Sequence, residues 1–290
     1  MRAATVVEGR IAVAELPDPA PGPGEVLIRV RAAGINGADI AQRAGRYPPP
    51  PGVTDVPGLE CAGETEDGER VMALLAGGGQ AELAVAPREH VLPVPEGWSW
   101  EQAGGFMEAF ATAHDALFSQ GGLRPGERLL VNGAAGGVGT AGVQLGAAGG
   151  AEVTASARHH HAELRALGAA TDVEGAYDVI LELVGGENLA ANLDRLAPKG
   201  RILLIGMGAG GRAEVDFSRL MRTRGRIFGS TLRPRSREEK AEVVALLGAF
   251  LAAHELTVPV EEAFPLERAQ DAYERFRAGG KLGKIVLSVT

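Results

Sequence analysis

The stretch Leu129-Leu-Val-Asn-Gly-Ala-Ala-Gly-Gly-Val-Gly-Thr140 decides the fold. Its apolar start is typical of a buried strand, and its glycines permit a tight turn before a small-residue helix expected over residues 140–148. Gly133, Gly136 and Gly139 form a relaxed dinucleotide fingerprint, in which a pyrophosphate approaches the backbone and the helix packs closely on the strand. Free N–H groups and the dipole at the helix N-terminus would hold the anion. The stretch therefore predicts a nucleotide-binding turn.

The sequence after this turn alternates short β-rich runs with helical patterns. Further strands are expected at residues 152–155, 178–183 and 201–205, each followed by a loop. This alternation predicts an α/β Rossmann domain, with a doubly wound parallel sheet covered by helices on both faces. Ligands bind outside the carboxyl ends of such strands, so these loops should line a cofactor groove. The residues assigned to it are Gly133, Ala134, Gly136, Gly137, Val138, Gly139, Val184, Gly206, Met207 and Gly208.

The first hundred residues follow another pattern. Short apolar runs at residues 26–31 and 70–75 are separated by segments rich in proline and glycine, which indicates a β-rich domain with irregular loops. Near the end, helices are expected over residues 239–253 and 268–277, followed by a strand over residues 284–289. A chain of 290 residues is long enough for two domains.

Composition and charge limit the class of protein. Hydrophobic content of 45% and charged content of 23% are those of a globular protein, and no apolar run approaches the roughly 18 residues that span a bilayer. No signal peptide is apparent, so a cytoplasmic location is expected. The net charge of −8 argues against general nucleic-acid binding. Eight arginines between Arg212 and Arg237 are interpreted as solvated surface, with a wall for cofactor phosphates as the alternative.

The single cysteine and the histidines predict no metal site. Cys61 alone excludes a disulfide framework within the chain and a multi-cysteine zinc site, and we expect it to be packed rather than reactive. The histidines at residues 159–161 are adjacent, and three adjacent side chains cannot easily face one ion. We expect them at an exposed helix start.

The end of the second strand of the Rossmann domain indicates which dinucleotide binds. A carboxylate there would bind a ribose 2′-hydroxyl, whereas Ser156 and Arg158 suit a 2′-phosphate. Glu152 lies at the other end of that strand and cannot reach the ribose. The sequence therefore predicts NADP(H) rather than NAD(H). The alternative is that Arg158 points to solvent and that the choice of cofactor is loose.

Several pieces of sequence, taken in order, are more specific than any single glycine motif. They are residues 33–39 (Ala-Gly-Ile-Asn-Gly-Ala-Asp), 42–52, 57–63, 73–81, the glycine turn, 229–236 and 283–287. Together they resemble the medium-chain dehydrogenase/reductase superfamily, and within it the zinc-free, zeta-crystallin-like quinone oxidoreductases. The resemblance covers nearly the whole chain. It implies a GroES-like β-rich substrate domain (residues 1–114 and 256–290), an inserted Rossmann domain (residues 115–255), and substrate in the cleft between them.

The resemblance also assigns catalytic residues. Zinc alcohol dehydrogenases of the superfamily have a cysteine where Asn36 stands and a histidine where Leu59 stands, so no metal is expected. The acceptor would then be polarised by Asn36 and Tyr47, and the Tyr47 phenol could deliver a proton. The alternatives are that Asn36 fixes its loop and that the Tyr47 ring packs on the prolines after it. Asp39 is expected to order the loop.

The resemblance adds residues to the cofactor site, and this chain departs from the family near them. Besides Ser156 and Arg158, the site receives His160, where relatives often have a lysine, and Arg233 and Lys284 from the later motifs. The chain lacks a segment after Gly63. It also lacks most of the stretch between residues 172 and 177, which normally holds a strand and a helix near the adenosine.

The expected function is that of an NADPH-dependent quinone oxidoreductase, in which hydride passes from the nicotinamide to a quinone without zinc. One alternative is an NADPH-dependent reductase of α,β-unsaturated carbonyls or enoyl thioesters. Another is an NADPH-binding protein with little turnover. The expected partner is a small quinone or enone, with no nucleic acid and no membrane. Residues 226–232 are a candidate edge strand of the Rossmann sheet, so a homodimer through that edge is expected.

Overall fold

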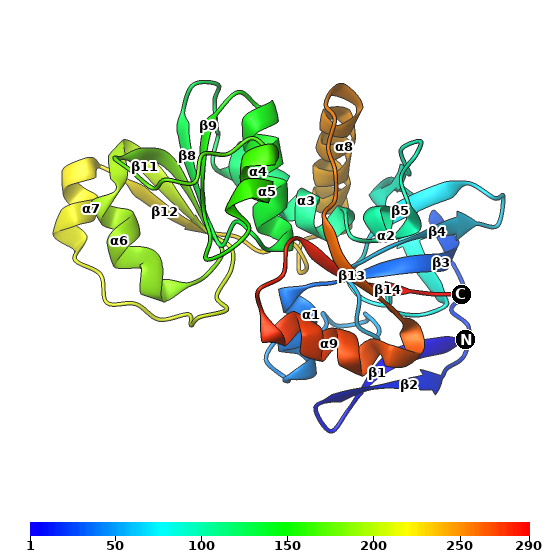
Figure 1. The fold of residues 1–290 in the computed structure, drawn as a ribbon. Helices are drawn as coiled ribbons and strands as arrows, with labels where there is room; N and C mark the ends of the chain where they lie inside the picture. The colour runs from blue at the N-terminus through cyan, green and yellow to red at the C-terminus, as the bar shows by residue number, and fades with distance from the viewer. The chain divides into compact units, whose positions relative to one another are not determined.

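The computed structural model describes all 290 residues, which divide into two compact units (Figure 1). Met1–Ala111 and Leu232–Thr290 form the first unit, and Thr112–Thr231 form the second. Helix α8 (Arg237–Ala253) packs on η1 (Arg88–His90) in the first unit, where His90 Nε2 lies 2.8 Å from the Arg237 carbonyl oxygen. The second division therefore lies after Thr231, earlier than the boundary after residue 255 that the sequence suggested.

The first unit is built on a seven-stranded sheet with the order β13-β14-β3-β4-β5-β7, in which β6 also pairs with β3; β1 and β2 form a separate hairpin. The strands are β1 (Arg2–Val7), β2 (Arg10–Glu15), β3 (Glu25–Ile35), β4 (Glu60–Thr65), β5 (Arg70–Leu74), β6 (Leu83–Pro87), β7 (Val91–Pro93), β13 (Val260–Pro265) and β14 (Lys284–Ser288). The other helices are α1 (Gly37–Arg43), α2 (Trp100–Gly104), η4 (Leu266–Arg268) and α9 (Ala269–Ala278), and α3 (Met107–His114) crosses the division between the units. β4 and β5 are joined by the short hairpin expected over residues 64–69.

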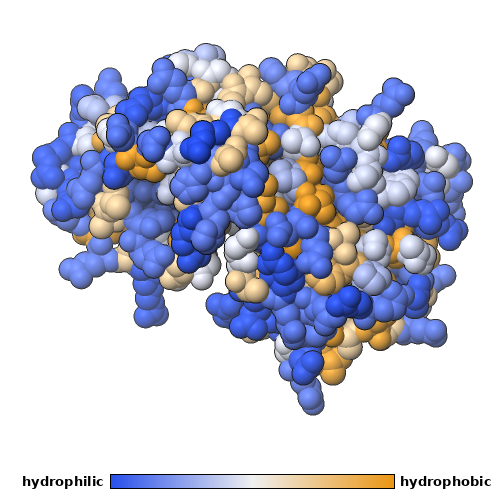
Figure 2. All heavy atoms as spheres, in the orientation of Figure 1, coloured by the Kyte–Doolittle hydropathy of each residue, from blue (hydrophilic) through white to orange (hydrophobic).

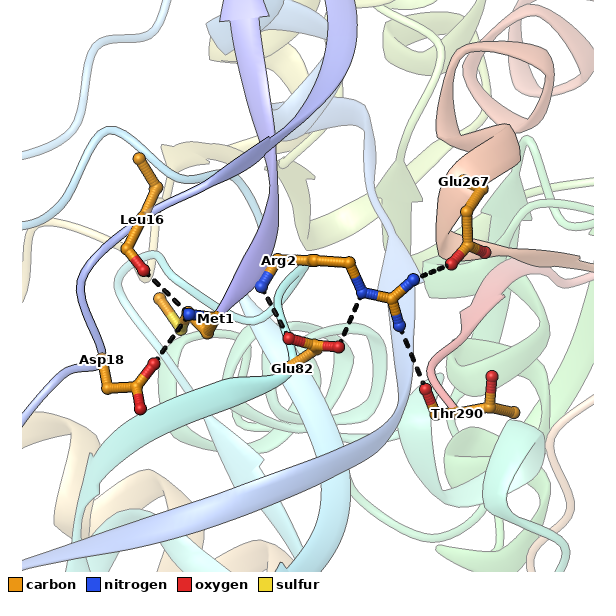
Figure 3. Close-up of polar contacts among 7 residues, drawn as sticks. All are labelled: Met1, Arg2, Leu16, Asp18, Glu82, Glu267 and Thr290. Atoms are coloured by element: carbon orange, nitrogen blue, oxygen red, sulfur yellow. Dashed lines mark hydrogen bonds and ion pairs between the residues drawn. The ribbon is translucent and has the colours of Figure 1, made fainter.

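Residues from the two ends of the chain meet in this unit. β14 pairs antiparallel with β3, so that Ile285 faces Ile35 across the ladder. Arg2 donates through its backbone N–H and its Nε to the two carboxylate oxygens of Glu82, at 2.6 and 2.7 Å (Figure 3). Its guanidinium also contacts Glu267 and the Thr290 carbonyl. The first unit is therefore discontinuous in sequence, as the resemblance implied.

The second unit is a five-stranded parallel sheet with the order β12-β11-β10-β8-β9. Its strands are β8 (Arg128–Asn132), β9 (Glu152–Ser156), β10 (Tyr177–Glu182), β11 (Leu196–Leu204) and β12 (Arg226–Gly229). Its helices are α4 (Gly137–Ala148), α5 (His161–Ala166), α6 (Leu189–Asp194) and α7 (Phe217–Thr223), with short helices η2 (Asp115–Gln120) and η3 (Gly186–Asn188). In Figure 1, α4 and α5 lie on one side of this sheet and α6 and α7 on the other. The predicted α/β Rossmann fold is confirmed.

The edges of this sheet show where the chain departs from a six-stranded Rossmann sheet. Beyond β9, a bridge between Thr154 and Ala170 stands where the third strand of the 3-2-1-4-5-6 order would lie. This reduction matches the missing stretch before Tyr177. At the other edge lies β12, as expected, and its pairing with a second copy stays a prediction.

Burial follows from these layers. In β8 and β10 the central residues Leu129, Leu130 and Ile180 are at most 1% exposed, as in parallel strands covered on both faces. Figure 2 shows hydrophilic residues over most of the visible surface of each unit, with apolar residues in small groups. Exposed large apolar side chains include Phe217 and Met221 on α7. No helix combines the length and hydropathy needed to span a bilayer.

Cys61 lies in the core of the first unit, as expected, and is fully buried. Burial in apolar surroundings raises the pKa of its thiol to about 12. The thiolate is the reactive form, so we expect no reaction of the native protein with an aromatic disulfide at about pH 8. The same reagent should titrate one thiol per chain in concentrated guanidinium chloride. Rapid release of the chromophore from the native protein would show that the thiol is accessible and this interpretation wrong.

Candidate functional site

Strand β8 leads directly into the glycine turn. Gly133 has φ +76°, a left-handed conformation that favours glycine. The N–H groups of Gly133 and Ala134 donate to the Ser156 carbonyl at 3.0 and 3.1 Å, which fastens the turn to the end of β9. Helix α4 begins after Gly136, which has no side-chain cap. The N–H groups of its first turn, at residues 137–139, have no acceptor within the helix, and their binding of a pyrophosphate stays a prediction.

A buried carboxylate that the sequence analysis missed lies at the same edge of the sheet. Glu182 is the last residue of β10 and is fully buried. Its Oε1 accepts hydrogen bonds from the N–H groups of Val184 at 2.7 Å and Gly185 at 2.9 Å. Its Oε2 accepts from the side-chain amides of Asn132 at 2.8 Å and Asn192 at 2.7 Å. The side chain thus joins the end of β8 to the loop after β10.

The backbone of Glu182 reaches a third loop. Its carbonyl accepts from the N–H groups of Ile205 at 3.0 Å and Gly206 at 3.1 Å, directly after β11 ends. A Cβ on Gly206 would lie 2.1 Å from the Leu183 carbonyl oxygen, so only glycine fits this approach. Glu182 therefore contacts the end of β8, which leads into the glycine turn, and the loops after β10 and β11.

Other residues predicted on these loops differ in what they offer a ligand. The Val184 N–H donates to Glu182, and its carbonyl accepts from Ala209 at 2.8 Å, so its side chain and the second lone pair of its carbonyl remain for a cofactor. Met207 is 68% exposed, and Gly208 is exposed beside it. Their contact with a dinucleotide stays a prediction.

The residues predicted for the 2′-phosphate lie at the carboxyl end of β9. Ser156 ends the strand and is half-buried, and Arg158 is exposed in the loop. His160 adopts a left-handed conformation with φ +67° just before α5, and its Nδ1 lies 3.6 Å from a Glu163 carboxylate oxygen. His159 and His161 are exposed at this helix start, as expected. No carboxylate ends β9, so the strand end is compatible with a phosphate.

The first unit holds a buried polar cluster around Asn36. Its Nδ2 donates to Glu60 Oε1 at 2.8 Å, and Lys284 Nζ donates to both Asn36 Oδ1 and Glu60 Oε1 at 2.6 Å. Glu60 is fully buried and Lys284 is 3% exposed. The second Glu60 oxygen accepts from the Glu108 N–H at 2.9 Å. The Asn36 amide is therefore fixed in orientation, and one of its two amide hydrogens remains for another acceptor.

Asp39 orders the loop that carries Asn36, as expected. Its carboxylate accepts from the Asn36 N–H at 2.7 Å and the Gly58 N–H at 3.0 Å, and it forms a capping box at the start of α1. The side chain is fully buried, and burial raises the pKa of Asp39 to about 6. Asp39 thus positions Asn36 through the backbone.

Arg233, assigned to the cofactor by resemblance, lies buried in the first unit beside the Tyr47 loop. Its guanidinium donates to the Ala76 carbonyl at 2.7 Å, the Tyr47 carbonyl at 3.2 Å and Gln42 Oε1 at 2.8 Å. It also lies 5.3 Å from the centre of the Tyr47 ring, which is half-buried. Arg233 therefore fixes the Tyr47 loop, while any contact of its remaining N–H groups with a cofactor stays a prediction.

The set of side chains around Asn36 is not one that binds a metal ion in zinc enzymes. An asparagine amide and a lysine ammonium surround Glu60 there, and an ammonium is no metal ligand. In the whole chain, no three His, Cys, Asp or Glu side chains come together in an arrangement that could hold a metal ion.

Comparisons with known proteins agree with the fold and indicate which family of proteins the chain resembles. Residues 22–96 match an alcohol dehydrogenase GroES-like domain, and residues 150–287 match a zinc-binding dehydrogenase domain. The chain is 31% identical to the quinone oxidoreductase of Mus musculus over 301 residues, which cover 93% of this chain and 90% of that protein. It is 36% identical to the Streptomyces venezuelae pikromycin polyketide synthase component PikAII over 299 residues, 92% of this chain but 8% of that protein. The solved quinone oxidoreductase of Thermus thermophilus, which was also studied in complex with NADPH, superposes with a TM-score of 0.86 at 35% identity, covering 99% of this chain and 100% of that one.

Proposed function

Because the chain belongs to the zinc-free quinone oxidoreductase family of the medium-chain dehydrogenase/reductases, we propose that it reduces a quinone with NADPH and without a metal ion. The observation that carries the proposal is the Asn36 amide, which Glu60 and Lys284 hold where zinc enzymes of the superfamily place a cysteine. A fixed amide hydrogen can polarise a carbonyl oxygen as it gains charge.

The glycine turn fits a dinucleotide, because its backbone is kept free of side chains where a pyrophosphate would approach. A Cβ on Gly139 would lie 2.4 Å from the Gly133 carbonyl oxygen, so the turn and α4 can pack this closely only with glycine. The first-turn N–H groups of α4 would bind the pyrophosphate. NADPH, when bound, supplies the hydride.

The residues of the first unit would handle the acceptor. Asn36 donates its remaining amide hydrogen to a quinone oxygen, and the Tyr47 phenol delivers the proton that accompanies the hydride. Arg233 holds the Tyr47 loop in place through the Tyr47 carbonyl. One hydride and one proton convert the quinone to its hydroquinone, so no covalent intermediate with the protein is required.

The proposed preference for NADP(H) rests on the end of β9. Ser156 offers a hydroxyl there and Arg158 a guanidinium in the exposed loop, and His160 lies beside them with its Nδ1 3.6 Å from a Glu163 carboxylate oxygen. The Thermus thermophilus relative was studied with NADPH, which supports the same choice.

A second candidate is the reduction of α,β-unsaturated carbonyls or enoyl thioesters. The match to a segment of a polyketide synthase favours it, because that segment aligns with 92% of this chain at 36% identity. Hydride transfer to a conjugated carbon needs the same carbonyl polarisation by Asn36. The two acceptors must therefore be separated by assay.

The test is NADPH oxidation with a simple benzoquinone, run beside NADH, an enal and a sample treated with EDTA. We expect rapid NADPH loss with the quinone, unchanged by EDTA and faster than with NADH. Turnover with the enal alone would establish the second candidate instead. NADPH binding without turnover of either acceptor would contradict the roles given to Asn36 and Tyr47 and leave an NADPH-binding protein.

A further inference from the structure

We propose that Glu182 is the positioning residue of the dinucleotide site, the group that fixes the three cofactor loops relative to one another. The inference rests on the proposed function, since it assumes that these loops bind a dinucleotide. Neither the glycine fingerprint nor the resemblance includes this residue. Glu182 ends β10 beside the end of β8, and between these two strands the strand order reverses, which is where ligands of open α/β sheets bind.

Every group around the Glu182 carboxylate is a donor. Four hydrogen bonds of 2.7–2.9 Å come from Val184, Gly185, Asn132 and Asn192, and a longer one of 3.3 Å comes from the Asn188 amide. No lysine or arginine pairs with it. A buried carboxylate is costly unless its oxygens are satisfied, and here N–H groups alone satisfy them. The carboxylate is thus the common acceptor for segments that would otherwise have unpaired donors.

Three of these donors flank or belong to the proposed cofactor loops, while Asn192 lies on α6. Asn132 directly precedes Gly133, so its amide fixes the start of the glycine turn; it also donates to Asn192 Oδ1 at 2.8 Å. The N–H groups of Val184 and Gly185 donate to Glu182, so they are not available to an anion. The pyrophosphate would therefore be bound by the N–H groups of the first turn of α4. Displacing Glu182 would therefore move the glycine turn and the loop after β10 together.

The loop after β11 is coupled to the same residue. Besides the two bonds to the Glu182 carbonyl, Gly186 N–H donates to the Gly210 carbonyl at 2.9 Å. A Cβ on Gly185 would lie 2.6 Å from that same oxygen, so the loops touch backbone to backbone. A shift of one loop is passed to the other, and Glu182 anchors both.

A reciprocal pair of substitutions tests this role. Glu182→Gln keeps the shape but directs an amide donor at the amides of Asn132 and Asn192. We expect NADPH to bind roughly 10- to 100-fold more weakly, the range for losing a buried hydrogen bond to a charged group. Asn192→Asp alone places two carboxylates side by side and should weaken binding as well. In the variant that carries both changes, the introduced glutamine amide donates to the introduced aspartate carboxylate, and Asn132 keeps residue 192 as an acceptor although it still faces the glutamine amide. Affinity should therefore recover at least about threefold over that of Glu182→Gln, a non-additive result.

A matched control lies on the same strand. Asp178 is near the amino end of β10, away from the loops, and its carboxylate accepts from the Arg128 N–H at 2.9 Å. Asp178→Asn makes the same chemical change and should leave NADPH affinity unchanged. Thermal unfolding of all four variants separates a general loss of stability from a loss of affinity in the folded protein.

The outcomes are distinct. Weak binding in both single variants and recovery in the double variant would establish the role of Glu182. If folded Glu182→Gln binds as the wild type does, or the folded double variant stays weak, the inference is wrong while the proposed function stands. If the wild type binds NADH but not NADPH, the affinities of the same variants are measured with NADH. In that case only the proposed preference for NADP(H) is wrong. A wild type that binds neither dinucleotide overturns both.

Discussion

Replacing Lys284 with methionine is expected to lower the free energy of unfolding by about 3–5 kcal/mol, the cost of removing one partner from a buried ion pair. The ammonium is the cation that pairs with Glu60, 2.6 Å away, and both side chains are almost completely buried. Methionine fills the space but leaves the Glu60 carboxylate uncompensated, and Asn36 Oδ1 loses its donor. Urea unfolding of the two proteins measures the difference.

Two further variants make the Lys284 result specific. Adding Glu60→Gln to Lys284→Met removes the unpaired charge, so the double variant should recover more than half of the lost stability. Arg268→Ala breaks an exposed ion pair with Asp271 and should change stability by less than about 1 kcal/mol. A stable Lys284→Met protein whose NADPH affinity alone has fallen would support the cofactor role that the resemblance gave to this lysine.

Gly139→Ala is expected to abolish measurable dinucleotide binding and to lower the free energy of unfolding by about 1–3 kcal/mol, as overpacking does. The added Cβ would lie 2.4 Å from the Gly133 carbonyl oxygen and 2.6 Å from two backbone carbons of Ala134. These are backbone atoms, which cannot rotate away as a side chain would. The glycine turn must open, and the first-turn N–H groups of α4 are then misplaced for a pyrophosphate.

Gly136→Ala is the matched control for this change. It lies three residues away in the same turn, has φ −77°, and a Cβ there would meet the Gly133 carbonyl oxygen at an ordinary 3.5 Å. Its stability should stay within about 0.5 kcal/mol of the wild type, the range for a substitution without a clash. Binding of NADPH is followed by isothermal titration and unfolding by urea. Equal effects of the two substitutions on stability would contradict the packing argument.

Local patterns were sufficient to predict the Rossmann fold. The apolar run before Gly133 and the apolar residues of β10 are continuous because both faces of a parallel strand are covered, and this signal is contained within a few residues. The glycine turn is equally local. The exposed helix start at His161 was also predicted from adjacent residues, whereas the edge position of β12 was predicted from its place late in the Rossmann domain.

The cluster around Asn36 could not be predicted in this way. Lys284 lies 248 residues from Asn36, and they meet only because β14 lies beside β3. No periodicity within either segment records that pairing, so Lys284 was assigned from the resemblance and its Glu60 partner was missed. Helix α8 is a similar case. Its amphipathic pattern predicted a helix, while the contact between His90 and Arg237 that attaches it to the first unit is long-range.

Glu182 left a weak signal that could have been used. It is the residue before the end of the strand predicted over residues 178–183, and Asn132 follows the apolar run of residues 129–131. Neighbouring parallel strands bring their carboxyl ends together. Only the loops after these strands were predicted to bind the dinucleotide, and the polar residues just before the loops were missed. A polar residue that ends a buried strand is therefore worth considering when such sites are predicted.

The pairing of β14 with β3 also sets the order in which the protein can be completed during synthesis. Residues 112–231 form a unit that is contiguous in sequence, so all its contacts are available once that stretch has left the ribosome. Synthesis of the first unit begins earlier, but its folding cannot be completed at that stage, because Glu60 cannot pair with Lys284 until residue 284 has been made. Until then residues 32–35 of β3 lack their partner strand on one edge, and the unit that is started first is the one that is finished last.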